Sequence, residues 1–126
     1  MTMRVAQAGI VLILCSCAGS QPPVDAGGPP VELAGRMAGA PRRCVMLNQL
    51  GSVRVSETDA HTLVFGSGKT IWTNHMGQCS LRRDDIVVTE PSGSQLCVGD
   101  VARSLDRNSG IAGPSCVLSD FVPYSR

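Results

Sequence analysis

The chain has 126 residues, which suits one domain and little more. Its formal net charge is +1, so charge gives no reason to expect nucleic acid or an acidic surface as a partner. Its few aromatic residues are too sparse to form a platform on which nucleic-acid bases stack. They are Phe65, Trp72, Phe121 and Tyr124.

The N-terminus has the pattern of a bacterial export signal. Arg4 follows the initiator methionine closely, and residues 5–14 form an apolar run. A run this short suits a signal peptide, because a membrane-spanning helix needs about 20 apolar residues. Leu14 stands three residues before Cys17 and Ser16 directly before it, which resembles the lipobox of bacterial lipoproteins. We therefore expect residues 1–16, Cys15 included, to be removed as a lipoprotein signal peptide and Cys17 to be lipidated.

Lipidation of Cys17 would anchor the chain to a membrane, since each buried methylene of an acyl chain contributes about 0.8 kcal/mol. Ala18 follows Cys17, and no Asp stands there to indicate retention in the inner membrane. We expect an outer-membrane anchor with the chain facing the periplasm. The alternative is an ordinary secretory signal that is cut after Ala18 or Gly19 and releases a periplasmic or secreted protein.

Residues 17–40 are predicted to be a flexible, lipid-anchored tether rich in Pro, Gly and Ala. Pro22-Pro23 and Pro29-Pro30 exclude a continuous helix. The small side chains offer little to bury against the entropy cost of ordering the backbone. As coil, this segment would span roughly 25–30 Å.

Residues 41–126 are predicted to be one disulfide-stapled β domain. Short β-rich runs alternate with Gly, Asn, Asp and Ser breaks, and Gly66 to Lys69 joins the clearest hairpin. Strands are expected over residues 44–47, 52–56, 62–65, 70–74, 86–89, 95–98 and 116–122, with one helical turn over 100–105 and a loop over 108–114. The pattern favours an all-β fold with at most one short helix, built as a small antiparallel sandwich or barrel.

Four cysteines remain after processing: Cys44, Cys79, Cys97 and Cys116. An even number spread over separate strands in an oxidising compartment predicts two disulfides. Three pairings are open to four cysteines, and the sequence alone does not select one. We favour Cys79–Cys97, which joins neighbouring segments, with Cys44–Cys116 joining the first and last strands.

Other kinds of site fit the sequence poorly. A zinc site from the cysteines with His61 or His75 is disfavoured, because no Cys-x-x-Cys pair exists. A hydrolase using His75 is a remote alternative that lacks a Gly-x-Ser-x-Gly nucleophile turn. Gly66 to Thr70 matches only the end of a phosphate-binding loop and reads as a hairpin turn. We predict no catalytic residue, no metal and no cofactor.

Three further features have structural explanations. The cluster from Arg82 to Asp85 compensates its own charge and is expected to be a solvated turn. Asp100 is expected to cap the turn that follows it. Trp72 is expected to pack in the core or on a sheet face.

Cysteine, glycine and turn positions recur as short motifs through the domain. They are Cys44-Val45-Met46, Gly51-x-Val53-Arg54-Val55, Thr62-Leu63, Trp72-x-Asn74, Gly77-x-Cys79-x-Leu81, Gly93-x-x-Leu96-Cys97-x-Gly99-Asp100 and Cys116-x-Leu118. Together they resemble a family of small, cysteine-containing lipoproteins of Gram-negative bacteria that is classed as a domain of unknown function. The resemblance implies an exported lipoprotein and no particular activity.

The sequence thus predicts a protein that is not an enzyme. We expect a periplasm-facing lipoprotein that acts as a structural or interaction module, with an unknown envelope protein or small ligand as its partner and no nucleic acid. The alternative of a different class is a freely secreted small binding or inhibitor domain.

Overall fold

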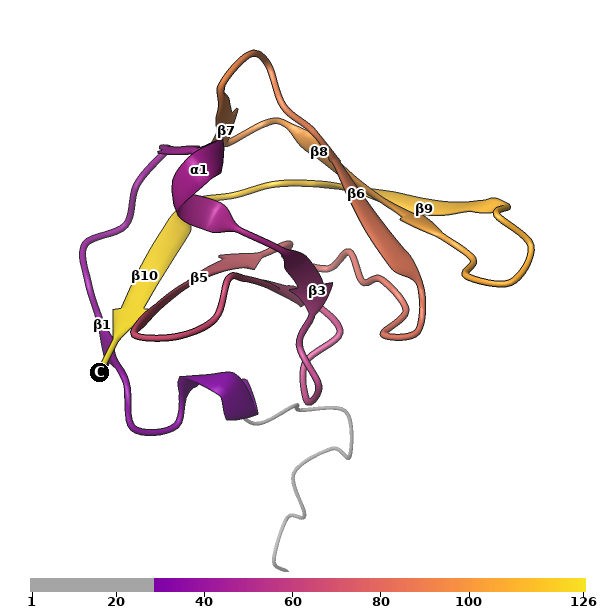
Figure 1. The fold of residues 1–126 in the computed structure, drawn as a ribbon. Helices are drawn as coiled ribbons and strands as arrows, with labels where there is room; N and C mark the ends of the chain where they lie inside the picture. Colours follow the sequence, from indigo (N-terminus) through magenta and orange to yellow (C-terminus); the bar gives the residue numbers. More distant parts are fainter. Residues whose placement is uncertain (1–28) are drawn as a thin grey trace, which may run out of the picture.

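The computed structural model describes residues 29–126, so the predicted signal peptide and the lipidation of Cys17 lie outside the described residues. Short strands and two single helical turns follow one another along this part (Figure 1). They are η1 (Val31–Leu33), β1 (Met37–Ala38), β2 (Cys44–Met46), α1 (Leu47–Leu50), β3 (Val53–Val55), β4 (Thr62–Phe65), β5 (Thr70–His75), β6 (Ile86–Glu90), β7 (Gln95–Cys97), β8 (Val101–Leu105), β9 (Ala112–Val117) and β10 (Phe121–Ser125). The predicted all-β class is confirmed. In the described part, no helix has the length and apolar character that crossing a membrane requires.

The largest sheet has five antiparallel strands in the order β1-β10-β5-β4-β3. The predicted hairpin of β4 and β5 is present, with Phe65 opposite Trp72. Its turn begins at Gly66, whose φ is 78°. A Cβ at Gly66 would lie 2.9 Å from the carbonyl oxygen of Leu50, so both the backbone conformation and the close approach favour glycine there.

The two faces of this sheet have different neighbours. Leu63, Phe65 and Phe121 belong to the main hydrophobic core, and the rings of the two phenylalanines lie 5.8 Å apart between centroids. Val64 and Ile71, on the opposite face of the same sheet, are also buried, but neither belongs to that core cluster. The opposite face of the sheet is therefore covered by another part of the chain.

Two smaller antiparallel sheets complete the core. One pairs β2 with β7, and the other has the order β6-β8-β9 and extends to one side of the molecule (Figure 1). Ala102 and Ser104 of β8 point inward and are fully buried, while Arg103 between them forms an ion pair with Glu90 across the outer face. Core residues thus come from all three sheets, as Leu63, Leu96 and Ala102 illustrate.

The helical turn predicted over 100–105 is wrong, because Val101–Leu105 is the central strand of the three-stranded sheet. Small inward residues at Ala102 and Ser104 weaken the apolar alternation that indicates a strand. The last strand was also misplaced. Residues 116–122 contain the end of β9, a crossing between sheets and the start of β10, and β9 already begins at Ala112 inside the predicted loop.

Two disulfides are present, as predicted, but the favoured pairing was wrong. The bonds are Cys44–Cys97 and Cys79–Cys116. Cys44 lies directly opposite Cys97 in the register of β2 and β7. Cys116 points into the core from β9, where Cys79 packs against the same cluster. The pairing follows from which strands are neighbours in space, and that differs from their order in the chain.

The predicted tether also extends too far towards the C-terminus. Val31–Leu33 forms η1, and Met37–Ala38 forms β1, which pairs with β10. The pairing of β1 with β10 stops at Pro123, which has no N–H to donate. Gly39, the residue after β1, still donates one hydrogen bond to the Pro123 oxygen. Residues 30–41 are therefore part of the fold, and we call them the strap.

The structure makes a prediction about the bridges. Replacing Cys79 and Cys116 together by Ala should lower the free energy of unfolding by about 4 kcal/mol, because a long loop of the unfolded chain is then no longer closed. Urea denaturation measures this loss. Peptide mapping without reductant should find the same two bridges, and a Cys79–Cys97 or Cys44–Cys116 peptide would contradict the structure.

Candidate functional site

The strap is held at one end by the connection between β3 and β4. The Glu32 carboxylate accepts hydrogen bonds from Ser56 Oγ at 2.8 Å and from the backbone N–H of Glu57 at 2.9 Å. The backbone N–H of Val31 donates to Thr58 Oγ1 at 3.0 Å. Ser56 is fully buried, and its hydroxyl oxygen accepts from the Thr58 N–H, so Glu32 supplies the acceptor for the hydroxyl proton.

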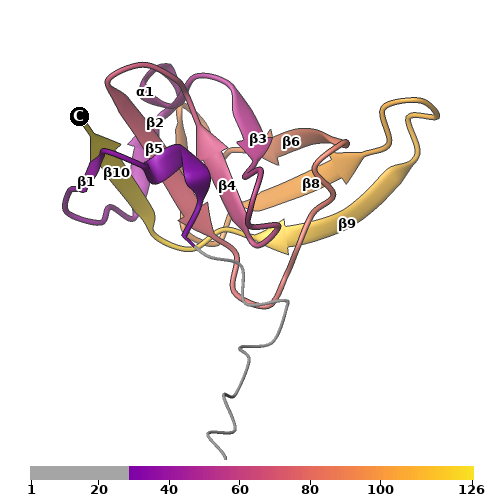
Figure 2. The same cartoon turned by 90° about the horizontal axis from the view of Figure 1, so that it is seen from below.

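The other end of the strap is held at the turn between β4 and β5 and at β10. The Arg36 guanidinium donates to the carbonyl oxygens of Gly68 at 2.6 Å and Lys69 at 2.8 Å. The N–H of Gly39 donates to the Pro123 oxygen at 2.7 Å. Figure 2 shows η1 lying across β4 and β5. The strap thus spans the face of the five-stranded sheet that points away from the core.

A cavity of about 380 Å³ lies between the strap and this face. The strap provides Pro30, Leu33 and Pro41 to its wall. The sheet and its connections provide the remaining wall residues: Asp59, Thr62, Thr73, His75, Ser119, Asp120, Val122 and Tyr124. Apolar surface with a few polar groups is typical of sites that take a small ligand or a side chain.

Asp59 lines the cavity with a carboxylate that is held by hydrogen bonds. Its carboxylate accepts hydrogen bonds from the backbone N–H of His61 at 2.9 Å and from Thr62 Oγ1 at 2.7 Å. Burial alone would raise the pKa of this carboxyl, but the two hydrogen bonds and the nearby imidazoles of His75 and His61 lower the pKa below its ordinary value of 3.8. Asp59 is therefore ionised at neutral pH and is fixed in one orientation.

The two histidines have defined hydrogen-bond partners. Their ring centroids lie 6.4 Å apart. A backbone carbonyl only accepts, so His61 Nδ1, 3.0 Å from the Cys79 oxygen, carries the proton. A backbone N–H only donates, so His75 Nδ1, 3.2 Å from the Gly77 nitrogen, accepts. Neutral His75 then has its proton on Nε2 and can donate one hydrogen bond from there.

These groups are not arranged as a nucleophile and its base. Ser119 lies beside His75, but its hydroxyl donates to the His75 backbone oxygen and not to the ring. The four cysteines of the described part are all in disulfides, so none supplies a thiolate for catalysis or for the zinc site considered above. The geometry supports recognition of a ligand better than covalent chemistry at His75.

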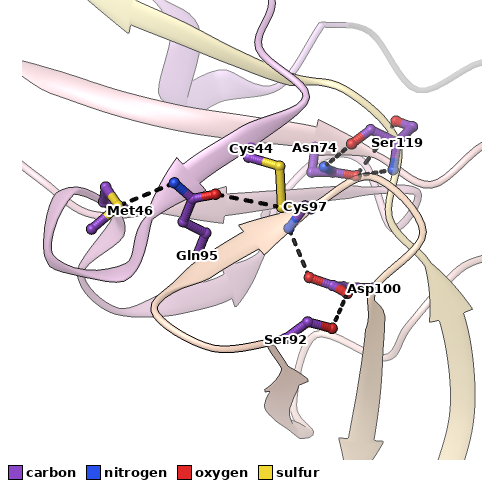
Figure 3. The surroundings of a disulfide bond; sticks show 8 residues. All are labelled: Cys44, Met46, Asn74, Ser92, Gln95, Cys97, Asp100 and Ser119. Atoms are coloured by element: carbon purple, nitrogen blue, oxygen red, sulfur yellow. Dashed lines mark hydrogen bonds between the residues drawn. A yellow bond between two sulfur atoms is a disulfide. The ribbon is translucent and has the colours of Figure 1, made fainter.

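Asn74 fixes the backbone at one edge of the cavity. Nothing in the sequence pointed to a functional residue at this position. Its side-chain amide is fully buried, donates to the Ser119 oxygen at 2.7 Å and accepts from the Ser119 N–H at 2.9 Å. Figure 3 shows this pair near the Cys44–Cys97 bond. The pair holds the crossing from β9 to β10, and Asp120 next to it therefore lines the cavity.

The other residues discussed in the sequence analysis stabilise the fold. Asp100 accepts from the Cys97 N–H at 2.8 Å and from Ser92 Oγ at 3.2 Å, so it stabilises a turn before a strand and does not cap a helix (Figure 3). Trp72 is buried, with the Arg42 guanidinium 5.6 Å from its ring centroid. Gly66 to Thr70 is the hairpin turn already described.

Comparison with known proteins assigns neither a family nor a function to the chain. No protein-family model, no curated protein and no solved structure matches the chain. Within residues 29–126, no group of three or more His, Cys, Asp or Glu residues is placed to hold a metal ion. The function must therefore be argued from the site itself.

The strap makes the structure pH-dependent through Glu32. Burial alone would raise the pKa of this carboxyl, but hydrogen bonds from the Glu57 N–H and Ser56 and the charge of Arg54 lower it below 4.5. A lowered pKa in the folded state means that the stabilisation is complete above the unfolded value and is lost as pH falls through the folded one. The strap should therefore loosen in acid, at a pH below 4.5.

The amide signal of Glu57 in NMR spectra reports this change. Titration from neutral pH to about pH 3 should shift it in the wild-type chain. Glu32→Gln should weaken docking at neutral pH and remove most of the acid-dependent shift. Glu57→Gln changes the same charge on an exposed neighbour and is the matched control. An unaltered Glu57 titration in Glu32→Gln would contradict the assignment.

Proposed function

We propose that the protein is an exported lipoprotein that acts as a binding module of the bacterial cell envelope. In this proposal Cys17 carries the lipid, the outer membrane is its anchor, and residues 29–126 face the periplasm. Two disulfides in one small domain support export, because such bonds persist in oxidising compartments and are rare in the cytoplasm. The short apolar run before Cys17 supports the anchor, as does the resemblance to small Gram-negative lipoproteins.

The cavity beneath the strap is the observation that supports binding. Its volume of about 380 Å³ admits a small molecule or a side chain of an envelope protein. The fixed carboxylate of Asp59 and the Nε2–H of His75 provide an acceptor and a donor beside the apolar surface of Leu33 and Val122. A ligand that offers both kinds of hydrogen-bonding group would be held in one orientation.

The strap places this cavity near the proposed anchor. Only residues 18–29 separate Cys17 from Pro30, which lines the cavity. A fully extended chain covers about 3.3–3.6 Å per residue, so the cavity wall begins at most about 45 Å from the anchor. The proposed binding site is thus held near the membrane surface, where envelope components are concentrated.

Replacing Cys17 by Ser tests the anchor. The variant should lose labelling by a fatty-acid analogue and should move from the membrane fraction to the soluble periplasmic fraction, because the acylated thiol is gone. Replacement of Cys15, expected to leave with the signal peptide, is the matched control and should change neither. A mature N-terminus after Ala18 or Gly19, with membrane association unchanged in Cys17→Ser, would favour the freely secreted binding domain.

Site-specific photo-crosslinking tests the binding site in cells. A crosslinking amino acid in place of Tyr124, which lines the cavity, should give one defined adduct. The same group in place of Met37, which is 81 % exposed on the strap outside the cavity wall, is the control. The adduct should disappear when His75 is replaced by Ala. Equal adducts from both positions, or an adduct independent of His75, would reject the cavity as the site.

A further inference from the structure

The fixed carboxylate in the wall of the cavity beneath the strap can accept more hydrogen bonds than the protein provides. Asp59 Oδ1 accepts from the His61 N–H, and Asp59 Oδ2 accepts from the Thr62 hydroxyl. A carboxylate has about four lone-pair sites on its two oxygens, so roughly half of this capacity is left. Within residues 29–126, Asp59 forms no ion pair. Its carboxylate is therefore held in place and can accept from a further donor in the cavity.

The threonine and serine hydroxyls of the cavity wall donate their protons to the protein. Thr62 donates to Asp59, and Thr73 donates to a backbone oxygen of β10. Ser119 donates to a backbone oxygen of β5. A hydroxyl has one proton and two lone pairs, so the capacity that these groups have left is to accept. The wall therefore offers a ligand mainly acceptors.

The carboxylates of this wall have no lysine or arginine beside them. Asp59 and Asp120 both line the cavity, and none of the described residues that line it is a lysine or an arginine. An anion would be repelled by the two carboxylates without gaining a guanidinium or ammonium partner. A neutral ligand would leave the charge of the half-buried Asp59 without a counter-charge. The electrostatics of the wall therefore favour a positively charged ligand.

The apolar part of the wall suits the alkyl stem of such a cation. The strap contributes Leu33 and two prolines, and β10 contributes Val122. Lysine and arginine side chains lay their methylene groups along surfaces of this kind while the charged head reaches a polar group. Tyr124 adds an aromatic ring to the wall, and aromatic rings attract cations through their faces. A cavity of about 380 Å³ has room for one such chain.

We propose that the cavity beneath the strap binds an organic cation, an ammonium or guanidinium group on an alkyl stem, with Asp59 as its acceptor. Both head groups have several N–H donors and no acceptor, which matches a wall whose free groups are mainly acceptors. The same chemistry is carried by a lysine or arginine side chain of an envelope protein and by a free diamine. The Nε2–H of His75 suits a backbone carbonyl of the protein, which a diamine lacks. The inference rests on the proposed function, because it names the class of ligand for the same cavity.

Titration of the full-length protein at neutral pH, followed by NMR, tests the class of ligand. Nα-acetyl-lysine methylamide is the probe, and Nα-acetyl-norleucine methylamide, which has the same alkyl stem without the ammonium, is its matched control. We expect saturable shifts of the Asp59 carboxyl carbon signal and the Thr73 amide signal with the lysine derivative only. Equal shifts with both derivatives, or no saturable shift with the lysine derivative in the millimolar range, would overturn the proposal.

Asp59→Asn keeps the size of the side chain and removes its charge. It should weaken binding of the lysine derivative by about tenfold or more, because a hydrogen bond between two charged groups loses one of its charges. Glu57→Gln makes the same kind of change on an exposed side chain outside the cavity wall and should have little effect. Equal weakening in both variants would show a general effect of charge and would overturn the role of Asp59. If Asp59→Asn does not fold, the lysine and norleucine derivatives on the wild type decide the outcome.

Comparing the lysine derivative with 1,4-diaminobutane distinguishes the two sources of the cation. If the cavity takes a side chain of a protein, the lysine derivative binds more tightly, and His75→Ala removes this advantage because the donor to the carbonyl is lost. If the cavity takes a free diamine, 1,4-diaminobutane binds more tightly and His75→Ala has little effect. Both outcomes require that Asp59→Asn weakens binding.

Photo-crosslinking from position 124 in cells separates this proposal from the proposed function. An adduct that is lost in Asp59→Asn and kept in Glu57→Gln supports both. An adduct that depends on His75 but persists at the wild-type level in Asp59→Asn would overturn the cation and leave the cavity as a binding site. Saturable binding of the lysine derivative without any adduct in cells would support the cation site and overturn the partner in the envelope.

Discussion

The Cys79–Cys116 bond holds together the two parts of the domain that secondary structure alone does not join. Cys79 follows the five-stranded sheet, while Cys116 lies in the three-stranded sheet, and no strand belongs to both. Their Cα atoms are 5.8 Å apart across the shared core. A small domain buries limited apolar surface, so a covalent link between its sheets matters more than it would in a larger protein. The close contact of Gly113 in β9 with Ser104 in β8 and the cavity beneath the strap both require that the sheets stay in place.

A second constraint acts at the crossing from β9 to β10. The Asn74 amide bonds to both backbone groups of Ser119, as a neighbouring strand would, at a point where no strand is available. The crossing lets β10 enter the five-stranded sheet between β1 and β5. β10 is therefore an inner strand, and the five-stranded sheet is complete only when β10 has joined it. Contacts between such distant segments form slowly in folding, because a long loop must close first.

Local patterns in the sequence were sufficient for local features of the fold. The hairpin around Gly66 and the existence of two disulfides follow from turn residues and from an even cysteine count. The pairing of Cys44 with Cys97 does not follow, because it depends on the register of β2 and β7, which are far apart in the chain. The strap was missed because its contacts come from single polar residues, Glu32 and Arg36, in a segment whose composition is that of a linker. The burial of the Ser104 hydroxyl without a hydrogen-bond partner is a property of three-dimensional packing and has no signal in the sequence.

Pro114 in β9 has a consequence for the behaviour of the protein at high concentration. β9 is the outer strand of its sheet, and Val117 near its end is 62 % exposed. An open edge of this kind is a template for pairing with strands of other molecules, which leads to aggregation. Proline has no N–H and interrupts any ladder of hydrogen bonds that a further strand would need. The outer edge of the three-stranded sheet is thus protected against the intermolecular pairing that threatens small β domains.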